Sequence, residues 1–131
     1  MKNVMITTKK LGIWMDHSTA HIMEYTTESI QTKTITSKFT HDVKEHSLGK
    51  SERLMHTKEQ HQQSEYFKEL GSIIKKHDDV ILFGPTDAKF ELLNVLRADN
   101  SFGKIKIEIQ SADKMTDNQQ HAFVKEYFSK Q

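Results

Sequence analysis

The sequence predicts one α/β domain of three layers, with a mixed sheet packed between helices. Three short strand patterns joined by turns come first, which is typical of an antiparallel meander. Strand patterns then alternate with amphipathic helical patterns, which favours parallel strands joined by right-handed crossovers. The length of 131 residues suits a single domain. The expected order is β-β-β-loop-α-β-α-β-α over residues 1–131, with a tail at 1–10 and a long polar loop at 37–56.

The first three strands are expected before the polar loop. In "LGIWMDHSTAHIMEY" the apolar run Ile13–Met15 precedes the turn-forming residues Asp16–Thr19, and Ala20–Tyr25 resumes the strand pattern, which predicts a hairpin. Ser29–Thr36 alternates and is rich in threonine and isoleucine, which predicts an edge-like third strand. A homodimer formed along Thr32–Thr36 is therefore one expected interaction.

A helix is expected to follow the polar loop. Thr57 and Gln60 have the spacing of a capping box, and an apolar stripe over Tyr66–Ile74 continues the helical pattern until about His77. The run "VILFG" at Val80–Gly84 is short and apolar, which predicts a strand buried on both faces. The remaining expected elements are a helix from Pro85, an alternating strand at Lys104–Ile109, and a last helix capped by Thr116 and Gln119.

The composition excludes several classes of protein. With no cysteine, the chain has no disulfide scaffold, no thiolate zinc site and no cysteine nucleophile. A formal net charge of +1 gives no global basic field of the kind that duplex-binding proteins often carry. The sequence has no run of eighteen apolar residues, and its start, "MKNVMITTKKLGIW", lacks the apolar core of a signal peptide. We therefore expect a soluble cytoplasmic protein that needs no cofactor.

Histidines gather in and after the polar loop, which raises the question of a metal site. His41 and His46 are five residues apart, and so are His56 and His61. Zinc ligands on one helix stand three or four residues apart, whereas a separation of five places two side chains about 140° apart. The spacing therefore favours ordinary polar residues over metal ligands.

The segment "GPTDAK" is a candidate anion site. It follows a strand and opens a helix, where backbone N–H groups and the helix dipole attract anions. Gly84, Thr86 and Lys89 are the residues that would contribute. The structural alternative is a tight turn with Thr86 as the N-cap, since one glycine is not a phosphate-cradling loop.

Four segments in order resemble one family: "LGIWMDHSTAHIMEY", "KFTHDVKEH", "VILFGPTDAKFELLNVL" and "ADKMTDNQQHAFVKEYF". They are similar to the middle domain of the archaeal and eukaryotic class-1 peptide-chain release factors and of Pelota. "FGPTDAK" also resembles small bacterial stand-alone relatives of these factors. The resemblance covers roughly Leu11–Phe128 and implies an RNase H-like fold with a functional loop between the third strand and the first helix.

The resemblance also implies a function, with one departure. In release factors the loop tip carries Gly-Gly-Gln, which promotes peptidyl-tRNA hydrolysis, whereas the matching tip here is Gly49-Lys50-Ser51 and lacks the glutamine. We therefore expect a non-catalytic, translation-associated module that binds the ribosome or structured RNA through its polar loop, its cations contacting phosphate. The residues expected to bind are Lys44, His46, Gly49, Lys50, Ser51 and Arg53.

Two other functions stay open from the sequence. RNase H-like nucleases carry a metal-binding aspartate on the first strand, so Asp16 could serve a metal-dependent nuclease or peptidyl-tRNA hydrolase if further carboxylates lie close to it. Glu24, Glu108 and Asp113 are the candidates, while the structural alternative is that the Asp16 carboxylate shapes the strand-to-turn junction. A protein–protein adaptor is the other function that stays open.

Overall fold

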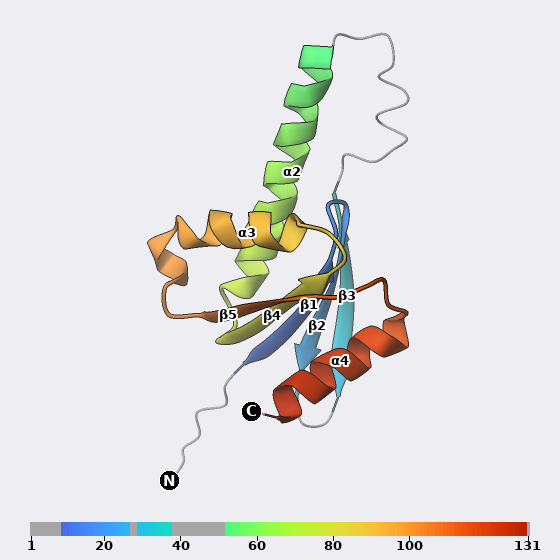
Figure 1. Cartoon of the computed structure of the whole chain (residues 1–131). Helices are drawn as coiled ribbons and strands as arrows, with labels where there is room; N and C mark the ends of the chain where they lie inside the picture. The colour runs from blue at the N-terminus through green and yellow to red at the C-terminus, as the bar shows by residue number, and fades with distance from the viewer. Residues whose placement is uncertain (1–8, 27–28, 38–51, 131) are drawn as a thin grey trace.

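The computed structural model describes residues 9–26, 29–37 and 52–130, with side chains from Gln63 onward in the first helix. Within these residues, five strands form one sheet with helices on both faces, which confirms the predicted three-layer α/β domain (Figure 1). In chain order the elements are β1 (Lys10–Met15), β2 (Thr19–Tyr25), β3 (Ile30–Thr36), α2 (Glu52–Ile74), β4 (Asp79–Gly84), α3 (Ala88–Arg97), the 3-10 helix η1 (Asn100–Phe102), β5 (Lys106–Ser111) and α4 (Asp117–Ser129).

The sheet is mixed, as the order of strands and helices predicts. Its strand order is β3-β2-β1-β4-β5. The β1–β2 and β2–β3 pairs are antiparallel, and the β1–β4 and β4–β5 pairs are parallel. Every residue of β4 is buried, which confirms the prediction for "VILFG", because β4 lies inside the sheet with helices on both of its faces. The edge position predicted for the third strand is also confirmed.

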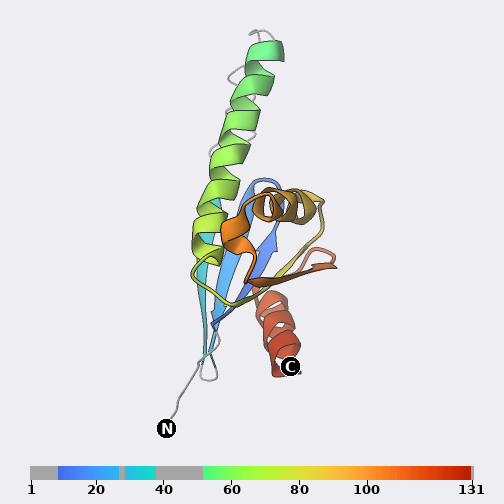
Figure 2. The same ribbon diagram turned by 90° about the vertical axis from the view of Figure 1, so that its left-hand side faces the viewer.

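The two faces of the sheet carry different side chains. Successive residues of a strand point to opposite faces, so neighbouring residues of β4 divide between them. Val80 and Leu82 pack with residues of α2 and α3 on what we call the aliphatic face. Ile81 and Phe83 pack with α4 on what we call the aromatic face. Figure 2 shows α4 separated from α2 and α3 by the sheet.

Helix α2 is longer than the sheet that it packs on. Its 23 residues span about 34 Å, whereas strands of six or seven residues span about 20–23 Å. Tyr66, Phe67, Leu70 and Ile74 in its C-terminal half are buried. The N-terminal turns extend past the end of the sheet (Figures 1 and 2). Packing therefore anchors the C-terminal half of the helix, and the backbone of the N-terminal half projects past the sheet.

Two predicted helix starts are wrong. The first helix begins at Glu52, so Thr57 and Gln60 lie within it and do not mark its start, and the predicted loop at 37–56 ends before residue 52. Glutamate, arginine, lysine and glutamine are good helix formers, so these polar turns are helical without an apolar stripe. Helix α3 begins at Ala88 and not at Pro85, and the alternating strand runs from Lys106 to Ser111, two residues later than predicted.

The capping box of the last helix is confirmed. The Thr116 hydroxyl accepts a hydrogen bond of 3.2 Å from the Gln119 N–H, and the Gln119 side-chain oxygen accepts one of 2.9 Å from the Thr116 N–H. This reciprocal pair satisfies two N–H groups that the first helical turn leaves unpaired. It fixes the start of α4, which places Val124 and Phe128 against the aromatic face.

Candidate functional site

The ends of β1 and β4 meet at one edge of the sheet, where the sequence places both Asp16 and the "GPTDAK" turn. In parallel α/β sheets, ligands bind beyond the carboxyl ends of the strands. Asp16 follows β1, and its Oδ1 accepts hydrogen bonds from the N–H groups of Ser18 (2.8 Å) and Thr19 (2.7 Å). This arrangement confirms the structural alternative for Asp16, whose carboxylate shapes the turn between β1 and β2.

Two further contacts join this turn to the helices. The Tyr66 hydroxyl of α2 donates a 3.0 Å hydrogen bond to the Asp16 carbonyl oxygen. Burial, and to a lesser degree the Asp16 charge, raises the pKa of Tyr66 well above its usual value, so the hydroxyl stays a donor. His17 Nε2 lies 2.7 Å from Glu91 Oε2 of α3. The turn is therefore held from both helices of the aliphatic face.

The turn after β4 brings two backbone segments very close together. Gly84 has φ +147°, and a Cβ atom at this position would lie 2.2 Å from the Met15 carbonyl oxygen. Only glycine fits both constraints, so the structure gives Gly84 a role in strand packing. Thr86 is not the N-cap, which is Asp87, but its hydroxyl accepts a 3.2 Å hydrogen bond from the Ala88 N–H.

Lys89 is directed into the protein. Its side chain is 2% exposed, and Nζ donates a 2.5 Å hydrogen bond to the Thr86 carbonyl oxygen. The same ammonium lies 4.9 Å from the centroid of the Phe90 ring. Because Lys89 is so little exposed, the described structure offers a ligand in solution little access to it. The anion site formed by Gly84, Thr86 and Lys89 stays a prediction, and the contacts of Lys89 account for this lysine structurally.

Of the three carboxylates proposed to join Asp16 in a metal site, Glu24 and Glu108 lie within strands, and Asp113 follows the end of β5. Glu24 pairs with Leu11, about 13 Å along the strands from the Met15–Ala20 pair. Glu108 pairs with Ile81 in β4, again several residues from the strand ends. Among the residues that the structure describes, no three histidine, aspartate or glutamate side chains are grouped to hold a metal ion. This part of the chain therefore lends no support to the metal-dependent alternative.

The predicted binding residues fall mainly on residues 38–51. Lys44, His46, Gly49, Lys50 and Ser51 lie outside the described residues, so their assignment stays a prediction. Arg53, the sixth residue, was predicted in the loop and lies instead in the first turn of α2. Its backbone is therefore carried by the projecting half of the helix (Figure 1).

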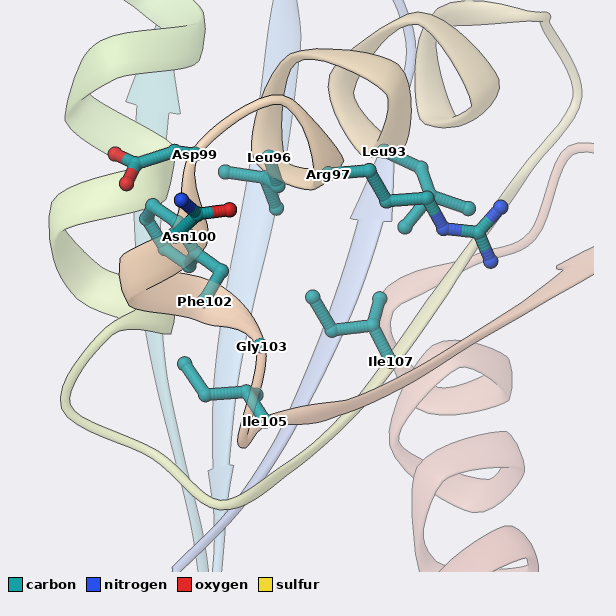
Figure 3. Close-up of a pocket in the computed structure, with 9 residues that line it drawn as sticks. All are labelled: Leu93, Leu96, Arg97, Asp99, Asn100, Phe102, Gly103, Ile105 and Ile107. Carbon is teal, nitrogen blue, oxygen red and sulfur yellow. The ribbon is translucent and has the colours of Figure 1, made fainter.

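A pocket of about 260 Å³ was not predicted from the sequence. It lies between α3, η1 and β5, and Figure 3 shows the Ile107 side chain extending from β5 toward Leu93 and Leu96. The alternating pattern of β5 predicts a strand but not which of its isoleucines stay partly uncovered. The exposure of these isoleucines depends on where α3 ends and on how η1 leads the chain back to β5.

A polar cluster on the aromatic face was also missed. The rings of Trp14 and His21 stack with centroids 5.2 Å apart, and His21 Nδ1 lies 2.7 Å from Gln120 Oε1 of α4. Gln120 is buried, and its Nε2 donates a 3.0 Å hydrogen bond to the Met115 carbonyl oxygen. The cluster connects β1, β2 and α4, so no local sequence signal could have revealed it.

Comparison with known proteins supports the fold. A scan against protein-family models finds no match, and a search of curated proteins finds none either. Pelota from Archaeoglobus fulgidus is similar in structure, with a TM-score of 0.60 and 9% identity over 91% of this chain and 31% of that protein. Pelota from Thermoplasma acidophilum has a TM-score of 0.55 and 20% identity over 90% of this chain and 32% of that protein.

A third similar structure is the archaeal translation termination factor aRF1. It has a TM-score of 0.52 and 13% identity over 93% of this chain and 39% of that protein. The chain thus spans about a third of the length of these proteins. The predicted resemblance is confirmed at the level of fold: this chain has an α/β fold found in Pelota and in an archaeal termination factor.

Proposed function

We propose that this chain is a translation-associated module that binds the ribosome or structured RNA and does not hydrolyse peptidyl-tRNA. The single observation that carries the proposal is the structural similarity to two Pelota proteins and to a translation termination factor over at least 90% of the chain. No contact among the described residues favours the metal-dependent alternative. A role in translation is also the reason to propose a cytoplasmic location.

The proposed binding element is the projecting half of α2 together with the residues before it. The helix begins at Glu52 and extends past the sheet, so Arg53 is carried away from the core (Figure 1). The sequence preceding the helix supplies the other proposed phosphate contacts, Lys44, His46 and Lys50. Contacts between cations and phosphates release counterions, so the affinity should fall steeply with salt.

Co-sedimentation with ribosomes at low and high salt tests the proposal. We expect the protein to pellet with ribosomes at about 50 mM salt and to be largely released at about 200 mM salt. Replacing Lys44, His46, Lys50 and Arg53 together by glutamine should abolish pelleting at low salt. The same assay run with loaded peptidyl-tRNA should show no peptide release, because the tip Gly49-Lys50-Ser51 has no glutamine.

A matched control distinguishes binding at one site from a general effect of positive charge. Lys68, Lys114 and Lys125 are exposed and lie on other parts of the surface. Changing these three to glutamine removes three lysine charges, to match the loss of Lys44, Lys50 and Arg53, and should leave pelleting unchanged. Equal loss in both variants, or pelleting that does not respond to salt, would contradict the proposed element. Absence of pelleting by the unaltered protein would contradict the function itself.

A further inference from the structure

Strand β5 is an open edge of the sheet. Within the described residues it pairs with β4 on one side only. The Lys106 N–H donates to the Asp78 carbonyl (3.0 Å), and the Ala112 N–H donates to the Gly84 carbonyl (3.2 Å). In a parallel pair, alternate residues of a strand bond the same neighbour. The even-numbered residues of β5 therefore face β4, and the N–H and C=O groups of Ile107 and Ile109 face outward.

The side chains of this edge are sorted by face. Ile105, Ile107 and Ile109 pack partly against the aliphatic face, and the first two line the pocket of Figure 3. Lys106 and Glu108 lie on the other face, with side chains 55% and 45% exposed and Nζ 3.7 Å from Oε1. The edge thus offers outward backbone groups, an apolar row on one face and one pair of opposite charges on the other.

We propose that β5 of a second copy of this chain adds to β5 in antiparallel orientation, about a two-fold axis at Ile107. Antiparallel pairing centred there sets Ile107 opposite the partner's Ile107, as a pair that exchanges both backbone hydrogen bonds. It sets Lys106 opposite the partner's Glu108, and Glu108 opposite the partner's Lys106. The two sheets become one continuous sheet, and the two pockets lie side by side along the apolar row.

The charges select this register among its neighbours. An axis at Lys106 would set two lysines opposite each other, and an axis at Glu108 would set two glutamates opposite each other. An axis at Ile109 would leave Lys106 opposite the partner's Ala112 and Glu108 opposite the partner's Gln110. Opposite charges stabilise directly facing positions and like charges destabilise them. Of these registers, only the axis at Ile107 makes both charged residues complementary.

The other edge of the sheet lacks this property. In β3, Ile30–Thr36, the sole charged residue is Lys33, so the strand has no acidic group to face it in a second copy. The homodimer expected from the sequence along Thr32–Thr36 thus has no charge complement. The self-complementary pattern of β5 makes a second copy, and not an arbitrary extended peptide, the occupant that fits this edge.

Sedimentation equilibrium of the full chain over a range of concentrations tests the proposal. We expect a reversible dimer. Lys106→Glu and Glu108→Lys each replace both facing pairs by like charges, and each should raise the dimer Kd about tenfold or more. The decisive sample is an equimolar mixture of these two variants. In the mixed dimer every facing pair has opposite charges again, so the mixture should associate about as tightly as the unaltered chain.

Controls make each outcome informative. Lys68→Glu and Glu69→Lys reverse exposed charges on α2 and should leave association unchanged. Thermal unfolding of each variant verifies that it is folded before it is mixed. If a single variant is unstable, the double variant Lys106→Glu/Glu108→Lys is used instead. It restores the charge pair within one chain. The proposal is overturned by a chain that stays monomeric at every concentration, by a dimer indifferent to the single reversals, or by a mixture that fails to associate.

Discussion

The two faces of the sheet are both covered by helices, but their cores are made of different side chains. The aliphatic face is covered by α2 and α3 and is filled largely by leucine, isoleucine and valine. The aromatic face is covered by α4 and is rich in rings. Phe83 and Phe123 stack with centroids 4.2 Å apart, and the tilted rings of Tyr25 and Phe128 have centroids 5.4 Å apart. Rings bury about 150–250 Å² each, so a single helix can complete a core with few residues.

The aromatic face also admits polar groups. Lys10 Nζ lies 5.7 Å from the centroid of the Phe128 ring, and Asp79 at the start of β4 is only 7% exposed. The His21–Gln120 contact lies on the same face. A charged side chain is also buried in a helix of the aliphatic face, since Lys89 of α3 is only 2% exposed. The two faces differ instead in the number of covering helices and in the apolar side chains that fill them. We therefore expect the faces to respond differently to substitution.

Neighbouring residues of β4 offer the sharpest comparison. Leu82 and Phe83 are both fully buried and point to opposite faces. Phe83→Ala should cost about 4 kcal/mol of unfolding free energy, and Leu82→Ala about 3 kcal/mol, because both leave cavities. Denaturant unfolding measures both values. Hydrogen exchange should speed up in α4 for the first variant and in α2 and α3 for the second.

The same exchange pattern in both variants would break the comparison, because the two faces would then form one cooperative unit. Leu82→Met keeps the side-chain volume and serves as the control, with a cost below about 1.5 kcal/mol.

Gly12 marks a point where α4 approaches the sheet closely. A Cβ atom at this position would lie 2.4 Å from Val124 Cγ2. Gly12→Ala should therefore cost about 1–3 kcal/mol through overpacking of the aromatic face. Val124→Ala removes the clashing methyl groups, so the double variant should be less destabilised than the sum of the two single variants. Strictly additive costs in denaturant unfolding would show that the backbones separate instead.

Asp79 should give the smallest effect, and one that depends on pH. Burial raises the pKa of its carboxyl, against the lowering effect of Lys106 and Lys10. Its Oδ1 atom has no hydrogen-bond partner in the described part of the chain. The folded state thus holds the proton more tightly than the unfolded state, and the contribution of Asp79 to stability falls as the pH rises from about 3.9 through the raised value.

Asp79→Asn removes this ionisation. At pH 7 the variant should be more stable than the unaltered chain by about 1 kcal/mol or less. The gain should disappear below about pH 3.9, where the aspartate is protonated in both states. Denaturant midpoints at a series of pH values measure the difference. A gain that is constant with pH would mean that folding does not shift the pKa of Asp79, and a loss at pH 7 would mean that the two lysines outweigh burial.

Local features of the fold could be predicted because their causes lie within a few residues. The turn at Asp16 rests on hydrogen bonds from Ser18 and Thr19, and the cap of α4 rests on Thr116 and Gln119. The buried strand at β4 follows from an uninterrupted apolar run. The start of α2 was predicted wrongly for the converse reason. Glu52 and the polar residues after it form a helix without the apolar pattern on which the prediction of a helix relied.

The candidate sites were harder to predict, because they depend on contacts between distant segments. Lys89 is a candidate for anion binding by its position in the sequence, yet it donates a hydrogen bond to the Thr86 carbonyl oxygen inside the protein. Glu24 and Glu108 are candidates by residue type, and the strand registers place them away from Asp16. The proposed binding residues Lys44, His46 and Lys50 were singled out by composition and resemblance, and they lie outside the described residues.

The sequence by itself determined the class of the domain, the order of its elements, the hairpin turn and the cap of the last helix, since periodicity, turn chemistry and capping act over a few residues. Only the tertiary structure decided which helix each strand residue contacts, why a side chain is excluded at Gly84 and crowded at Gly12, and which strand is left at the edge of the sheet beyond β4. These features arise where segments far apart in the chain approach one another, and a local sequence pattern does not indicate which distant segments will meet.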